Sequence, residues 1–162
     1  MNTISEPSDD MGTSDESTTF RDLFSALPEP FVDVGTSGDD TMFSTLFSIL
    51  KAKAGDDTII TGGGNARILA GPGDDRLEIT DGGVTKSNGG EGSDTFVFDD
   101  KGGTHLVTDF SLEEMDAILL LGDSEFEWDR TDIFEVTAQY GDTTLIFENV
   151  TGREFTYEEA FL

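Results

Sequence analysis

Four stretches of the chain share a glycine- and aspartate-rich form that sharply limits what the chain can fold into. Each stretch has glycine at its fourth position, aspartate at its sixth and a large apolar residue at its eighth; they span 35–42, 52–59, 70–77 and 89–96. A weaker copy at 61–68 keeps the glycine and the apolar residue but has Ala66 in place of the aspartate. A flexible acidic linker would not keep its apolar residues in phase, so this pattern favours a stacked repeat fold.

The four stretches resemble the hemolysin-type calcium-binding nonapeptide of RTX proteins, Gly-Gly-x-Gly-x-Asp-x-(large apolar)-x. The resemblance covers about residues 33–162 and implies an all-β fold, a right-handed parallel β-roll or β-solenoid. Six residues of each nonapeptide form a glycine-permissive turn, and three form a short strand whose apolar side chain points inward. Calcium prefers six to eight oxygen ligands, and in this family it lies between stacked turns.

The spacing of the aspartates predicts on which side of the roll the ions lie. Asp40 to Asp57 is 17 residues, Asp57 to Asp75 is 18 and Asp75 to Asp94 is 19. One coil made of two nonapeptides has about 18 residues. All four aspartate turns should therefore stack on one side, because the intervening turns lack the sixth-position aspartate. Four stacked turns enclose three gaps, and we expect three calcium sites.

The resemblance also implies the ligands of each site, namely carbonyls two and four of the upper turn, carbonyls one and three of the lower turn, and both aspartates. The first set is Thr36, Gly38, Asp40, Ala52, Ala54 and Asp57; the second is Lys53, Gly55, Asp57, Ala70, Pro72 and Asp75; the third is Gly71, Gly73, Asp75, Gly89, Glu91 and Asp94. Each middle aspartate is then shared by two ions.

Beyond the repeats, the resemblance is looser. Asp109 is implied to close a terminal site with Gly90, Gly92 and Asp94, although this chain has His105 where the family often has another aspartate. We expect His105 to be a surface or cap residue rather than a ligand, and Trp128 to be a packing anchor of the cap. The last six residues, 157–162, resemble the uncleaved C-terminal signal of type I secretion.

The rest of the chain divides into two further zones. Residues 1–32 are acidic and are expected to be disordered, with a short helix at about 19–27 where Phe20, Leu23, Phe24 and Leu27 recur at helical spacing. That helix would either dock on the domain or bind a partner. Residues 33–100 should form the roll. Residues 101–162 alternate apolar and polar residues around Gly141-Asp142-Thr143, which predicts an antiparallel β cap with a hairpin.

Charge excludes several functions. Nine Lys and Arg against 35 Asp and Glu give a net charge of −26, which disfavours nucleic acid and anionic membrane surfaces. No apolar run is long enough to span a bilayer, so we expect no membrane insertion. The absence of cysteine excludes thiolate zinc sites, and no serine-elbow, phosphate-loop, HExxH or EF-hand pattern occurs. A narrow roll also lacks the cleft that paired catalytic acids need, and we expect no enzyme activity.

The sequence therefore predicts a secreted, extracellular calcium-binding RTX module that folds on binding about three Ca²⁺ ions. The N-terminus lacks the basic and apolar regions of a signal peptide, which favours export through a type I ABC transporter. Three alternatives remain open. The first is a solenoid whose aspartates only form turns. The second is a calcium-dependent adhesion or polysaccharide-binding protein, with a glycan or protein partner. The third is a folding and secretion module of a larger hydrolase or epimerase.

Overall fold

The computed structural model describes residues 30–80, 82–129, 135–148 and 150. In this part of the chain all regular structure is β, and no helix has the length and hydropathy needed to cross a membrane. The expected disorder and helix before residue 30, and the expected secretion signal at 157–162, lie outside the described residues.

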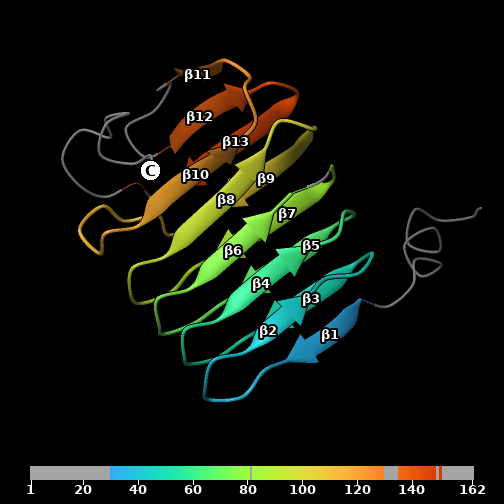
Figure 1. The fold of residues 1–162 in the computed structure, drawn as a ribbon, viewed down its shortest axis with the longest axis vertical. Helices are drawn as coiled ribbons and strands as arrows, with labels where there is room; N and C mark the ends of the chain where they lie inside the picture. The colour runs from blue at the N-terminus through green and yellow to red at the C-terminus, as the bar shows by residue number, and fades with distance from the viewer. Residues whose placement is uncertain (1–29, 81, 130–134, 149, 151–162) are drawn as a thin grey trace, which may run out of the picture.

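The strands wind into a solenoid of two facing sheets, which confirms the predicted parallel β-roll (Figure 1). Strands of one sheet alternate along the chain with strands of the other until the last two strands, β12 and β13, which follow β11 in the same sheet. The five-stranded sheet has the order β10-β8-β6-β4-β2, and the eight-stranded sheet has the order β1-β3-β5-β7-β9-β13-β12-β11. The five-stranded sheet consists of β2 (Thr41–Phe43), β4 (Thr58–Thr61), β6 (Arg76–Ile79), β8 (Thr95–Asp99) and β10 (Ala117–Leu121). The eight-stranded sheet consists of β1 (Phe31–Val34), β3 (Ser48–Lys51), β5 (Ala66–Leu69), β7 (Val84–Asn88), β9 (Gly103–Val107), β11 (Phe126–Asp129), β12 (Glu135–Tyr140) and β13 (Thr143–Glu148).

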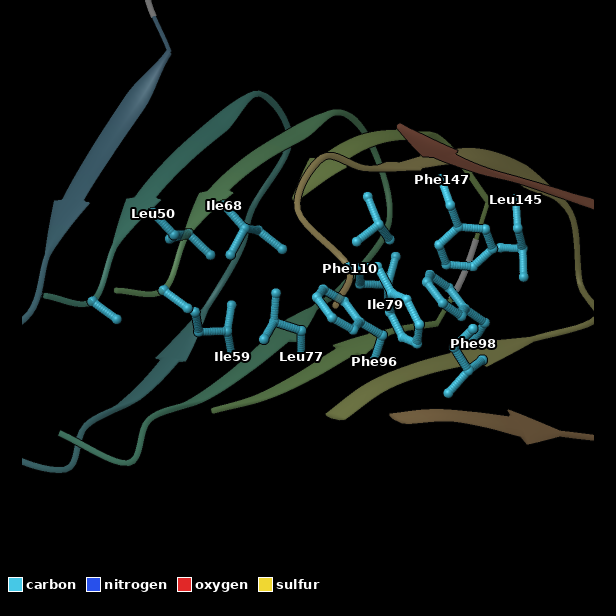
Figure 2. Close-up of a cluster of buried hydrophobic side chains, with 14 of the residues drawn as sticks. Leu50, Ile59, Ile68, Leu77, Ile79, Phe96, Phe98, Phe110, Leu145 and Phe147 are labelled. Carbon is cyan, nitrogen blue, oxygen red and sulfur yellow. The ribbon is translucent and has the colours of Figure 1, made fainter. Parts of the chain in front are cut away.

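The apolar residues of the repeats form the core between the sheets. From the five-stranded sheet, Ile59, Leu77 and Phe96 lie in register and are fully buried; from the opposite sheet, Leu50 and Ile68 face them (Figure 2). Strand geometry explains this arrangement, because alternate side chains of each short strand point to the same face. The in-phase apolar residues that favoured a repeat therefore stack as continuous rows along the roll.

The C-terminal part continues the roll before it closes it. The sequence placed the end of the roll near residue 100, but β9 pairs in parallel with β7, and β10 pairs in parallel with β8. The hairpin predicted around residues 141–143 is present as β12 and β13, whose antiparallel strands flank a turn at Gly141 and Asp142. Strand β13 joins β9 in parallel, which attaches the antiparallel strands to the eight-stranded sheet.

Candidate metal centre

A row of five aspartates runs along one edge of the roll, and we call it the aspartate ladder. Strands β2, β4, β6, β8 and β10 each begin directly after one of its members, which are Asp40, Asp57, Asp75, Asp94 and Asp116. Because these strands pair in register, the aspartates lie above one another. The N–H of each donates to Oδ1 of the next, with N–O distances of 2.7, 2.8, 3.0 and 2.9 Å along the ladder.

The second carboxylate oxygen of each middle aspartate has no partner. Oδ2 of Asp57, Asp75 and Asp94 is buried without a hydrogen bond, and these residues are only 1–2% exposed. Within the described ranges, no ladder aspartate forms an ion pair. Adjacent strands lie about 4.8 Å apart, so two ionised neighbours repel by about 3 kcal/mol at an effective dielectric constant of about 20. Buried, unpartnered and mutually repelling carboxylates are a donor set that fits a hard cation.

The environment of the ladder raises the pKa of its carboxyl groups. Burial, assisted by the charges of neighbouring aspartates, raises the pKa of Asp75 to about 6 and that of Asp94 to about 7. Burial likewise raises the pKa of Asp57, and it raises the pKa of Asp116 to about 6. Without a cation, keeping these carboxyl groups ionised at neutral pH therefore destabilises the folded state.

The turns that carry the ladder bring backbone carbonyls to the gaps. Positions two and four of the second to fourth turns have left-handed backbones, with φ of 91° at Lys53, 118° at Gly55, 122° at Gly71, 147° at Gly73, 118° at Gly90 and 129° at Gly92. In this conformation the carbonyl of one turn points at the next turn. The carbonyl oxygen of Lys53, for example, lies so close to Gly71 that a Cβ added there would collide with it. The glycines are thus required for both the backbone conformation and the close stacking.

Carbonyls at positions one and three occupy the same gaps. In the second gap, the N–H groups of Lys53 and Gly55 donate to the carbonyls of Ala70 (2.9 Å) and Pro72 (3.1 Å). In the third gap, the N–H groups of Gly71 and Gly73 donate to the carbonyls of Gly89 and Glu91, both at 2.8 Å. A carbonyl oxygen has two lone pairs, so each of these groups retains one acceptor site for an ion.

The first gap, between residues 36–40 and 52–57, does not repeat this pattern. Thr36 and Gly38 lack the left-handed backbone of the later turns. Asp40 Oδ2 instead accepts the backbone N–H of Thr36 (2.6 Å) and its hydroxyl (3.0 Å). The carbonyl of Ala52 lies against Gly35, and no hydrogen bond from the first turn reaches Ala54. Asp40 therefore forms the end of the ladder and is satisfied by its own turn.

Asp116 is a ladder member that the sequence reasoning missed. Its Oδ1 accepts the N–H of Asp94, and its Oδ2 accepts the N–H of Ser111 at 2.8 Å. The expected terminal residue, Asp109, lies beside it under the fourth turn, where its carboxylate accepts the N–H groups of Gly89 (3.0 Å) and Gly90 (2.9 Å). Burial raises the pKa of Asp109. The segment Asp116-Ala117-Ile118 repeats the aspartate–x–apolar ending of the repeat, which was the available signal.

His105, expected to be a surface or cap residue rather than a ligand, is not on the surface and pairs across β9 and β13 with Leu145 of the C-terminal hairpin. It is 1% exposed, stacks on Phe98 with ring centroids 5.7 Å apart, and has no hydrogen bond to either ring nitrogen. Burial lowers its pKa to about 4, although the nearby charge of Asp99 acts in the opposite direction. His105 therefore belongs to the interior of the roll near its cap and not to the ladder edge.

A cation at this edge would need carbonyl ligands as well as carboxylates. Across the residues that the structure describes, no three acidic or histidine side chains converge as a side-chain metal cluster would. The gaps instead offer one or two carboxylates together with several carbonyls. Oxygen-only sets of this kind suit Ca²⁺ better than zinc or copper, which favour nitrogen and sulfur ligands.

No protein-family model matches the chain, and no curated protein matches it. Among solved structures, the chain is similar to the extracellular lipase LipA from Serratia marcescens, with 21% identity over 81% of this chain and a TM-score of 0.38. The match covers 20% of the lipase, so this chain spans about a fifth of that protein's length.

Proposed function

We propose that the chain is a calcium-binding RTX-type module whose roll folds when about three Ca²⁺ ions enter the gaps of the aspartate ladder. The observation that carries this proposal is the row of unpartnered, buried Oδ2 atoms on Asp57, Asp75 and Asp94. A calcium-free solenoid could form the same turns with uncharged residues in place of these aspartates. Keeping three buried carboxylates ionised on successive coils at neutral pH is costly, and a bound cation offsets that cost.

The second and third gaps are the sites that the geometry supports best. Each holds two ladder aspartates and carbonyls from two turns, as described above. The first gap offers Asp57, but Asp40 is already bonded to Thr36. We therefore expect the first gap to bind calcium most weakly. We also assign a terminal site to the gap between Asp94 and Asp116, beside Asp109.

Calcium supplies the positive charge that this edge lacks. Because the ladder exists only in the folded state, the free energy of calcium binding stabilises the fold. A ligand at about 100 times its dissociation constant stabilises the folded state by roughly 2.7 kcal/mol per site. Three sites would contribute about 8 kcal/mol, which is comparable to the whole stability of a typical domain. At low calcium the ladder repels itself, and the chain would remain largely unfolded. This behaviour suits export through a type I transporter and folding outside the cell, which we include in the proposal.

The number of bound ions tests this proposal directly. Native mass spectrometry of the full chain in calcium should show three or more ions bound with graded affinity, whereas magnesium should not substitute. Asp75→Asn should weaken two ions, because Asp75 faces the second and third gaps. Asp116→Asn should weaken only the terminal ion. A chain that binds no calcium at millimolar concentration, or that loses equal numbers of ions in both variants, would contradict the proposed sites.

A groove on the outer face of the eight-stranded sheet favours a second candidate function, the binding of a carboxylate-bearing glycan. The groove has a volume of about 360 Å³ and is lined by Arg67, Ile68, Leu69, Lys86, Asn88, Thr108 and Glu148. Arg67 and Lys86 are direct neighbours across β5 and β7, and within the described ranges neither forms an ion pair. Binding of an acidic polysaccharide that requires calcium and is lost in Arg67→Gln would support this function. Under either candidate, we propose no enzyme activity for the chain.

A further inference from the structure

The first coil of the roll exposes an apolar surface, which we call the end patch. It consists of Phe31, Val32, Val34, Phe43, Leu46 and Phe47, which are 38–71% exposed. These six are among the nine exposed large hydrophobic residues of the described chain. Figure 1 shows that β1 and β2 lie together at one end of the stack. The end patch therefore coincides with the end of the solenoid at which no further coil follows.

The end patch has two sources: Phe31 continues a core row that stops at this end, whereas Val32, Val34 and Phe43 lie on the outer faces of β1 and β2. Phe31 is in register with Ser48 of β3, whose side chain points into the roll and is 2% exposed. Phe31 continues the same inward row, yet it is 57% exposed because none of the described strands lies beyond β1 in the sheet. Solenoid ends of this kind need a capping element to be soluble, since each repeat buries its apolar face only against its neighbours.

Part of the backbone at this end is already engaged in hydrogen bonds. The N–H of Val34 is already bonded to the carboxylate of Asp33 at 3.0 Å, and the N–H of Thr36 is bonded to Asp40. Two copies of a chain with a net charge of −26 would also repel each other in an end-to-end contact. A cover that brings apolar side chains rather than a strand edge fits the patch better.

The chain itself carries such a cover directly before β1. Phe20, Leu23, Phe24 and Leu27 follow the i, i+3, i+4, i+7 spacing of an amphipathic helix face, and Pro28 and Pro30 end the pattern. These residues lie outside the described part of the chain. Leu27 precedes Phe31 by four residues, a distance of at most about 14 Å when extended. We propose that residues 20–27 pack their apolar face on the end patch and cap the roll.

Cysteine cross-linking tests this placement, because the chain contains no cysteine of its own. Phe24→Cys combined with Leu46→Cys should form an intramolecular disulfide in calcium, identified by peptide mass spectrometry of the monomer. The matched control combines Phe24→Cys with Met115→Cys, since Met115 (73%) and Leu46 (71%) are almost equally exposed but Met115 lies two residues before β10, the strand at the other end of the five-stranded sheet. Equal yields in the two pairs would overturn the proposal, as would cross-linking only between two chains.

A second measurement does not depend on disulfide geometry. Phe24→Ser should expose the end patch, raising the fluorescence of an apolar dye and lowering the melting temperature in calcium. Ser25→Ala, on the opposite face of the expected helix, should leave both unchanged. If Phe24→Ser behaves like Ser25→Ala, or if the unmodified chain sediments as a dimer in calcium, residues 20–27 are not the cover.

Discussion

Replacing Asp75 with asparagine should stabilise the ion-free roll and destabilise the calcium-loaded roll. Burial raises the pKa of Asp75 from 3.8 to about 6. The pKa of this carboxyl is higher in the folded state than in the unfolded state. Its ionisation therefore progressively destabilises the folded state as the pH rises from 3.8 to about 6. At 1.36 kcal/mol per unit, the ionised group costs the ion-free fold up to about 3 kcal/mol at neutral pH. Asparagine is uncharged and keeps the oxygen that accepts the N–H of Asp57.

In calcium, the same substitution removes a charged ligand from two gaps. If each gap contributes roughly 2.7 kcal/mol at saturating calcium, losing both costs about 5 kcal/mol. This loss exceeds the gain of about 3 kcal/mol, so Asp75→Asn should be about 2 kcal/mol less stable than the unmodified chain in calcium. The sign of the effect therefore reverses between the two conditions.

Urea unfolding followed by circular dichroism measures both signs. Calcium-depleted samples need an osmolyte such as trimethylamine oxide, which favours the compact state, to populate the fold. The matched control is Asp74→Asn, one residue earlier in an exposed position, where Oδ1 accepts the N–H of Ser93 at 2.9 Å. The control should change stability by less than about 0.5 kcal/mol. An Asp75→Asn chain that is destabilised in both conditions, or in neither, would refute the cation-binding ladder.

Three further predictions follow from the same geometry. Acidifying the calcium-depleted chain from pH 7 to about 4 should increase its β signal in circular dichroism, because the raised pKa values of Asp75 and Asp94 let the folded state take up protons; a falling signal would contradict this. His105→Leu should increase the acid-induced stabilisation of the folded state by up to about 3 kcal/mol near pH 4, since the lowered pKa of His105 makes folding less favourable as the pH falls from 6.5 to 4. An unchanged acid response would contradict the burial of His105 as a neutral group. Gly71→Ala should cost more than about 3 kcal/mol in thermal unfolding, whereas Gly38→Ala, whose added Cβ meets nothing within 4 Å, should cost less than about 1 kcal/mol.

The fold and the edge of the ladder could be predicted from the repeat because the same few residues determine both the short strands and the stacking of the coils. An apolar residue two positions after each aspartate fixes the strand face, and the spacing of Asp57, Asp75 and Asp94 fixes the coil length. The resulting strand register and the hydrogen bonds between successive aspartates agree with that prediction.

Other features depend on contacts that no local pattern reveals. Asp116 follows a turn without the repeat's glycines, so its aspartate–x–apolar ending is a weak signal, and the pairing of β10 with β8 is what places it in the ladder. The burial of His105 results from packing against Phe98 inside the roll. The irregular first gap arises because Thr36, in a position where later turns have Lys53 or glycine, bonds to Asp40 instead of turning toward the next coil.

The most direct test of calcium-dependent folding is a calcium titration of the full chain followed by far-ultraviolet circular dichroism. We predict a largely unfolded spectrum in the chelated sample at neutral pH and a cooperative rise of β signal as calcium reaches the millimolar range. Magnesium at the same ionic strength should not produce this rise. A β spectrum that is already complete in chelator and is unchanged by calcium would contradict the account.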